Sequence, residues 1–216
     1  MTQLYNNKKQ EQEFHLLTPR KVTTSECNNI KSTFQLFNCS DSFVIAEQTL
    51  EFNCIGWAIG VREFIDPNRE INPHYNARLA YRAAAGYNGK QLFKYDENKS
   101  DCMKAVSEFF EAYKDRSVLP HKQYKPADTI SGPKDDTIAF YFISGEEGEK
   151  PLEGKGFTHA ARYIQDVNNW VSEVWTSKLG QYKLVTHGRD ELNDSIYGNV
   201  LCYLVPDDHS DYKSDL

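Results

Sequence analysis

Cys54 is the residue whose type and setting best suit covalent chemistry in this 216-residue sequence. It lies in the stretch EFNCIGWAIG, between a polar pair and an apolar run that is compatible with a helix. Asn53 is a residue type that caps helices, so the sequence predicts a helix that begins at Cys54. Free N–H groups and partial positive charge at a helix N-terminus lower the pKa of a thiol. Cys54 is therefore a candidate nucleophile, and the alternative is a small buried side chain.

A thiol nucleophile needs a base, and an imidazole can take the thiol proton near neutral pH. His159 opens the apolar stretch HAARYI after a Gly-rich loop, so a strand would fix the ring and leave one side open. His187 ends a later strand, and the other histidines lie near the termini or beside prolines: His15, His74, His121 and His209. We predict that His159 is the base, and the alternative is a structural histidine.

A histidine base also needs its second nitrogen held, so that the correct tautomer faces the thiol. The next predicted strand, WVSEVWTSK, offers Glu173, Thr176 and Ser177. Strand alternation places Glu173 and Ser177 on one face and Thr176 on the other. A hydroxyl or a carboxylate can serve, so the choice stays open, and the alternative is that these are polar side chains facing solvent.

Acyl transfer also requires donors for the negative charge that develops on the carbonyl oxygen. The backbone N–H of Cys54 at the helix start is one candidate. Asn53 and Gln48 are candidates for a second donor. For Asn53 the alternative role is the helix cap alone.

Helical patterns dominate the first half of the chain. They cover residues 25–39 with Ser25 as N-cap, the segment that starts at Cys54, residues 77–87, and residues 100–115. In the last of these, the spacing predicts that Val106, Phe109, Phe110 and Tyr113 are buried.

Strand patterns dominate after about residue 137, and one further strand or approach segment is expected over residues 43–50. The later strands are expected over residues 136–144, 157–165, 170–177, 182–187 and 198–205. Helices followed by strands indicate an α+β fold, with an antiparallel sheet packed against the helices. We expect residues 1–13 to be a disordered segment, residues 14–206 to form a single domain, and residues 207–216 to be a polar tail.

Composition narrows the function classes. The 25 basic and 31 acidic side chains give a net charge of −6, with no basic cluster that would favour nucleic acid or anionic lipid. The sequence contains no metal-ligand spacing, phosphate loop or dinucleotide fingerprint, so we expect no cofactor and no metal. Five cysteines without a C-x-x-C pair argue against a disulfide framework, and reduced thiols are the expectation.

No apolar stretch approaches the ~20 residues that a membrane-spanning helix needs. The N-terminal lysines are not followed by an apolar region of the Sec signal type. We therefore expect synthesis in a bacterial cytoplasm without a Sec signal peptide and no membrane insertion. If the protein is exported, we expect a route that does not read such a signal.

The order of a cysteine opening a helix, a histidine opening a strand and a polar residue on the next strand resembles papain-like cysteine hydrolases. NCIGWAIG, HAARYI and WVSEVWTS resemble most closely the NlpC-type branch, which includes peptidoglycan amidohydrolases, and are similar to TseH-type effectors of type VI secretion systems. The resemblance covers roughly residues 50–205. It implies a papain-like fold, with the nucleophile helix packed on a C-terminal antiparallel sheet, and it places Ser177 as the third catalytic residue.

The same resemblance implies a function. It suggests an antibacterial hydrolase that cleaves an amide bond in peptidoglycan stem peptides after contact-dependent delivery into a target-cell periplasm. The implied partners are peptidoglycan or a peptide substrate, a cognate immunity protein and a secretion-system carrier. Three alternatives stay open: a toxin acting on a protein or lipid, a transferase that uses the same cysteine and histidine, and a non-catalytic binding module on the same fold.

Overall fold

The computed structural model describes residues 14–65, 99–119, 123–143, 156–167, 171–180 and 182–207. The predicted helix over residues 77–87 lies outside these ranges, as do the predicted N-terminal segment 1–13 and all of the polar tail except residue 207.

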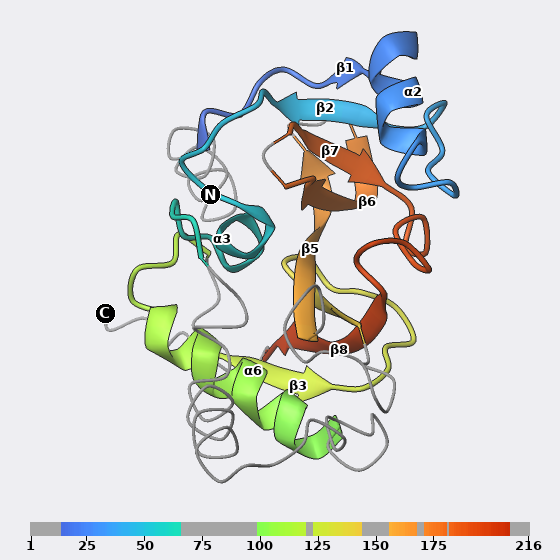
Figure 1. Cartoon of the computed structure of the whole chain (residues 1–216). Coiled ribbons are helices and arrows are strands. Elements are labelled where there is room, and N and C mark those ends of the chain that lie inside the picture. Colours follow the sequence, from blue (N-terminus) through green and yellow to red (C-terminus); the bar gives the residue numbers. More distant parts are fainter. Residues whose placement is uncertain are drawn as a thin grey trace, which may run out of the picture.

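The fold is α+β, with one eight-stranded antiparallel sheet and few helices in the described ranges (Figure 1). The sheet order is β1-β2-β7-β6-β5-β4-β8-β3, and every pair of neighbours is antiparallel. The strands are β1 (Arg20–Lys21), β2 (Phe43–Ala46), β3 (Tyr124–Ala127), β4 (Ile138–Ile143), β5 (Gly156–Val167), β6 (Val171–Lys178), β7 (Leu184–His187) and β8 (Asn199–Pro206).

Helices and strands are less separated along the chain than the sequence suggested. β1 and β2 precede the cysteine helix, yet they complete the sheet beyond β7. β3 was not predicted, because Pro126 lies in its middle and proline lacks a backbone donor. Among the described strands, β3 is at the edge of the sheet and pairs only with β8, and an edge strand tolerates a proline.

The first helix is shorter than predicted. α2 (Thr24–Lys31) is capped by Thr23 and not by Ser25, because Thr23 and Glu26 form a reciprocal capping box. The predicted helix extended to residue 39, but the chain leaves the helix after Lys31. The apolar side chains of Phe34 and Phe37 are buried from the turns that follow.

α3 (Cys54–Ile59) begins at the predicted cysteine, and all six of its residues are buried. The Asn53 side chain accepts from the Gly56 N–H at 3.0 Å, which confirms the predicted cap. Gly60 ends the helix in the left-handed region, at φ 71°. A side chain at Gly56 would meet the carbonyl oxygens of Val61 and Glu63, so glycine is required for the tight turn after the helix.

The sheet has two buried faces, which we call the helix face and the loop face. On the helix face, α3 packs over β5 and α6 (Lys99–Tyr113) packs beside β3 and β8 (Figure 1). Val106, Phe109 and Phe110 of α6 are buried as predicted, and Tyr113 is partly buried. On the loop face, side chains from β4, β5 and β6 pack against the turns after α2 and the β7–β8 loop: Ala139, Tyr141, Ala161, Tyr163 and Trp175 against Phe34, Phe37 and Leu192.

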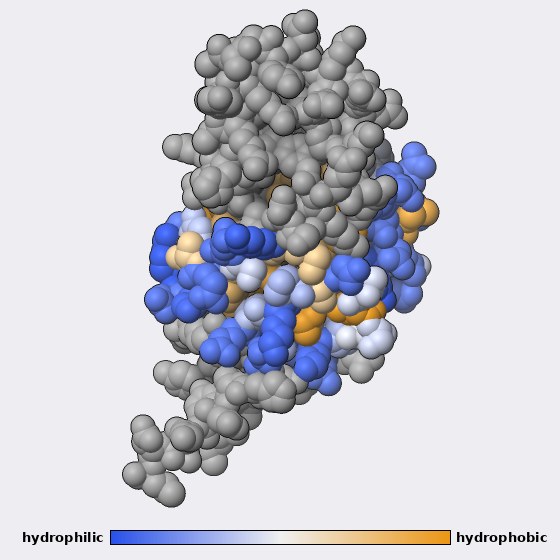
Figure 2. All heavy atoms as spheres, turned by 90° about the horizontal axis from the view of Figure 1, so that it is seen from below, coloured by the Kyte–Doolittle hydropathy of each residue, from blue (hydrophilic) through white to orange (hydrophobic). Residues whose placement is uncertain are grey.

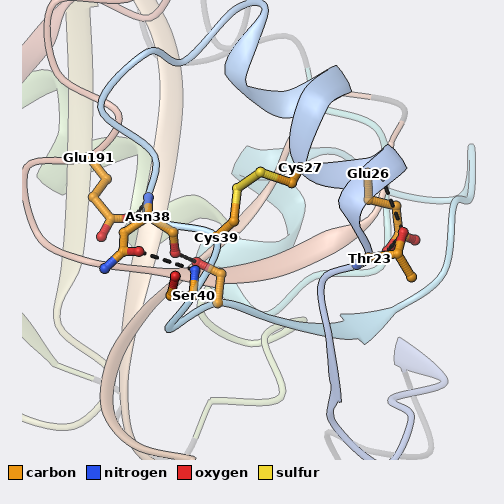
Figure 3. The surroundings of a disulfide bond; sticks show 8 residues. Thr23, Glu26, Cys27, Asn38, Cys39, Ser40 and Glu191 are labelled. Atoms are coloured by element: carbon orange, nitrogen blue, oxygen red, sulfur yellow. Dashed lines mark hydrogen bonds between the residues drawn. A yellow bond between two sulfur atoms is a disulfide. The ribbon is translucent and has the colours of Figure 1, made fainter.

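Two cysteines that were expected to be reduced form a disulfide. Cys27 of α2 is bonded to Cys39 in the following turn, 12 residues away (Figure 3). Their positions could not be paired from an odd cysteine count without knowing that the chain reverses after α2. Cys54 and Cys202 are buried and are not disulfide-bonded.

The described surface seen from below in Figure 2 carries mainly hydrophilic side chains, with hydrophobic ones in small groups. Within the described ranges, no helix combines the length and the apolar character needed to cross a bilayer.

Candidate active site

Cys54 lies at the seam where β5 and β6 part. The Tyr163 N–H donates to the Thr137 carbonyl, and the Tyr163 carbonyl accepts from the Asp136 N–H. Both backbone groups of Tyr163 therefore point to the side of β5 where β4 lies. Two-residue alternation therefore turns the backbone of Ala160 away from β4. The β5–β6 pairing ends at Arg162 opposite Thr176, so β6 does not pair with Ala160. The Ala160 N–H instead donates to the Cys54 sulfur.

The surroundings of Cys54 have opposing effects on the pKa of its thiol. The N–H groups of Cys54 and Ile55 at the helix start, the Ala160 N–H and the charge of buried Lys178 all favour the thiolate. Burial is the larger effect and raises the Cys54 pKa to about 11. In this conformation the group is a neutral thiol at pH 7.

Three polar side chains form a continuous hydrogen-bonded chain on the loop face of the sheet. His159 Nε2 lies 3.0 Å from Ser177 Oγ, and Ser177 Oγ lies 2.8 Å from His187 Nε2. His187 Nδ1 lies 2.7 Å from the Gly188 carbonyl oxygen. All three side chains are buried, so each hydrogen bond satisfies groups that water does not reach.

Aromatic rings fix the His159 imidazole on two sides. The Tyr197 ring from the β7–β8 loop stacks on it with centroids 3.8 Å apart and planes 7° apart. Tyr141, the cross-strand neighbour on β4, meets it edge-on at 5.3 Å. Burial holds the His159 pKa well below 6.5, so the ring is neutral. Its Nδ1 is buried and has no hydrogen-bond partner among the residues that the structure describes.

The structure brings His159 and Ser177 together, as an orienting role for Ser177 requires. It brings Cys54 to the residue next to His159, but no hydrogen bond joins the sulfur to the His159 ring among the described contacts. Alternation explains the offset, because Ala160 faces α3 whereas His159 faces the loop side with Tyr141.

The other predicted residues have different positions. Asn53 serves as the helix cap, and its amide donates to the Ile65 carbonyl at 2.6 Å, which ties the cap to the chain beyond α3. Gln48 is exposed after β2. Thr176 points to the helix face, where it accepts from Trp57 Nε1 at 3.0 Å. The Glu173 side chain lies outside the described part of the chain.

His187 is the residue of this hydrogen-bonded chain that we did not select from the sequence. The pairing of β7 with β6 shows on which face of the sheet His187 lies, because Trp175 is directly opposite it. Trp175, Ser177 and His187 therefore share a face. The sequence does not give the register between β6 and β7, so it predicted only that His187 ends a strand.

A buried ion pair stands on the helix face, behind α3. The Arg162 guanidinium is fully buried and lies over the Trp57 ring, with 3.9 Å between its central carbon and the ring centroid. Its Nε is 3.9 Å from Asp136 Oδ1, and within the described ranges none of its nitrogens has a hydrogen-bond partner. Burial lowers the Arg162 pKa and raises that of Asp136 to about 7. Among the described side chains, no cluster has the composition of a metal site.

The chain belongs to a family described as a domain of unknown function, DUF7689, whose profile matches residues 43–205. That range runs from β2 into β8 and contains Cys54, His159, Ser177 and His187. A comparison with curated proteins and a comparison with solved structures each found no match.

Proposed function

We propose that the protein is a papain-like cysteine hydrolase that cleaves an amide bond. Cys54 is the nucleophile, His159 is the base and Ser177 holds the base. The observation that carries this proposal is the state of His159: its Nε2 is held by Ser177, whereas its Nδ1 is buried, unpartnered and one residue from the N–H that contacts the Cys54 sulfur.

The reaction follows from these atoms. His159 Nδ1 takes the thiol proton while Cys54 Sγ bonds to the substrate carbonyl carbon, and the proton then passes to the leaving nitrogen as the C–N bond breaks. Water attacks the resulting thioester, with His159 taking its proton, and the proton returns to sulfur as the acid leaves. Because the thiol and the imidazole are not bonded in this conformation, substrate binding must bring them into contact across the β5–β6 seam.

Peptidoglycan stem peptides are the substrate class that we propose, on the strength of the resemblance to NlpC-type amidohydrolases. The Cys27–Cys39 disulfide supports a site of action outside a reducing cytoplasm, because such bonds persist in oxidising compartments such as the periplasm. An antibacterial role with a secretion carrier and an immunity partner belongs to the same proposal.

The test is digestion of purified sacculi by the full chain, with new amino groups and released fragments measured by mass spectrometry. We expect activity in the wild type and its loss in Cys54→Ser and in His159→Gln. Cys202→Ser is the matched control, since Cys202 is a buried cysteine outside the disulfide and lies on β8. Equal activity in Cys54→Ser and wild type would overturn the assignment of the nucleophile.

A non-catalytic binding module is the second candidate, and one observation favours it. Both Cys54 and His159 are buried and neutral, which is what ordinary core residues would be. A protein that binds sacculi without releasing fragments, equally in wild type and Cys54→Ser, would support this candidate.

A further inference from the structure

The proton order of the buried hydrogen-bonded chain can be derived from its outer end. A backbone carbonyl only accepts hydrogen bonds, so the 2.7 Å contact with Gly188 requires a proton on His187 Nδ1. A second proton on Nε2 would make His187 a buried cation, and among the described residues no carboxylate pairs with it. His187 is therefore neutral, and its Nε2 is an acceptor.

The next link follows from the first. Ser177 Oγ carries one proton and must donate it to His187 Nε2 at 2.8 Å, because that nitrogen has none to give. The Ser177 oxygen then has only lone pairs for His159, so His159 Nε2 donates across the 3.0 Å contact. A neutral imidazole with its proton on Nε2 presents a lone pair at Nδ1.

We propose that His187 is a positioning residue that sets the tautomer of His159 through Ser177. It acts through a one-way series of donors that ends on the Gly188 carbonyl, and it makes His159 Nδ1 the basic atom of the site. The catalytic consequence rests on the proposed function, whereas the proton order does not.

The two hydrogen bonds at position 187 explain why a histidine suits this position. The position requires a donor toward Gly188 and an acceptor toward Ser177 on one rigid side chain, and a neutral imidazole supplies both. If position 187 offered no acceptor, the Ser177 hydroxyl would be free to rotate and donate to His159 Nε2. That rotation would move the His159 proton to Nδ1, where it could no longer take a proton from a thiol.

The direct test is nitrogen NMR of the full wild-type chain labelled with 15N histidine, at pH 7. We expect His187 with its proton on Nδ1, the less common tautomer in water, and His159 with its proton on Nε2. His15→Gln, at an exposed position, assists assignment and should leave both patterns unchanged. A proton on His159 Nδ1, or a proton on His187 Nε2, would overturn the inference.

A variant pair extends the test to function. We expect His187→Phe to shift His159 toward the Nδ1 tautomer and to lower kcat by about 10²-fold with little change in KM, at the lower end of what a general base contributes. His187→Gln, which keeps an acceptor, should retain the Nε2 tautomer and more of the activity. An unchanged His159 tautomer in folded His187→Phe would contradict the inference.

The two proposals fail separately. If the tautomers are as expected but the protein does not cleave peptidoglycan, the proton order is upheld and the proposed peptidoglycan hydrolase function is contradicted. Hydrolysis that depends on Cys54, together with the opposite tautomers, would uphold the hydrolase and overturn the role of His187.

Discussion

At the scale of single residues, burial outweighs the helix N-terminus at Cys54. Three backbone N–H groups and Lys178 favour the thiolate, yet the pKa rises to about 11 because the sulfur has lost its contact with water. The helix start therefore positions the proposed nucleophile, and it does not by itself bring the pKa of the thiol near neutral pH. Activation requires His159 or a substrate-induced change of surroundings.

We expect Cys54 in the free protein to react slowly with iodoacetamide at pH 7–8, with a rate that rises toward pH 11. The reason is that only the thiolate attacks, and burial disfavours it. Mass spectrometry of modified peptides measures each rate, with Cys202 as the internal reference. Rapid modification of Cys54 at pH 7 would show an opened site with an activated thiol.

The buried pair of Arg162 and Asp136 should respond unequally to removal of its two members. Asp136→Asn leaves a buried guanidinium without a counter-charge, which typically costs about 3–5 kcal/mol. Arg162→Met removes the positive charge that lowers the Asp136 pKa, so burial raises that pKa further and the carboxyl becomes neutral. It also removes guanidinium donors that have no hydrogen-bond partner among the described residues.

Urea unfolding of both variants against wild type measures this difference. We expect the smaller loss of unfolding free energy for Arg162→Met. Equal losses would mean that the Arg162 side chain contributes mainly by packing on Trp57.

Residue types predicted part of the candidate site. The cap, the helix start and the strand pattern could be read locally, so Cys54 and His159 were selected without a structure. Strand parity left Glu173, Thr176 and Ser177 open, and Ser177 was chosen from the resemblance to NlpC-type hydrolases. His187 and the Arg162–Asp136 pair were not, because each depends on strand register or on a contact between distant segments. The offset of Cys54 and His159 to different sides of the sheet also required the register.

At the scale of elements, the disulfide joins α2 to a turn that is tied to the β7–β8 loop. The Asn38 N–H beside Cys39 donates to Glu191 Oε2 at 3.0 Å (Figure 3). The same loop supplies Tyr197, which stacks on His159. The disulfide thus restrains the turn after α2, which packs on the loop face of the sheet beside the β7–β8 loop.

We expect Cys27→Ser/Cys39→Ser to lose about 3 kcal/mol of unfolding free energy, the amount expected when the closed loop joins cysteines 12 residues apart. Urea unfolding without reductant is the measurement, and wild type with reductant should match the variant. Digestion under non-reducing conditions should give one peptide containing both cysteines. Separate alkylated peptides would contradict the bond.

Elements were predictable where the pattern was local. α3, α6 and the four strands after residue 156 follow their hydrophobic periods closely. The start of α2 depended on which of two neighbouring hydroxyl residues formed the capping box with Glu26. β3 was missed because an edge strand of four residues with a proline has no periodic signature.

At the scale of the whole molecule, the sheet buries two neutral histidines that an unfolded chain would protonate at mildly acidic pH. Burial lowers the His187 pKa from 6.5 to about 4 and also lowers that of His159. Because the unfolded state binds more protons below pH 6.5, the stability from the neutral histidines is present above that pH. It is lost as pH falls toward about 4.

We therefore expect the free energy of unfolding to fall between pH 7.5 and pH 5, by about 2 kcal/mol from His187 alone. Denaturant unfolding at a series of pH values measures the slope. His187→Gln, which removes one of the two buried rings, should have a shallower slope. A flat profile over this range would mean that the two rings are not buried in neutral form in solution.

The strand order also sets when the chain can fold as it leaves the ribosome. β2 ends at Ala46, yet the neighbour that joins it to the main sheet, β7, begins at Leu184, which is 184 − 46 = 138 residues later. At translation rates of about 5–20 residues per second, this interval lasts on the order of 10 s. Until Leu184 has been synthesised, β2 pairs with β1 on one side and lacks the strand that borders its other edge. The newborn chain therefore carries an unpaired strand edge throughout this interval, and such an edge is prone to pair with other chains until β7 covers it.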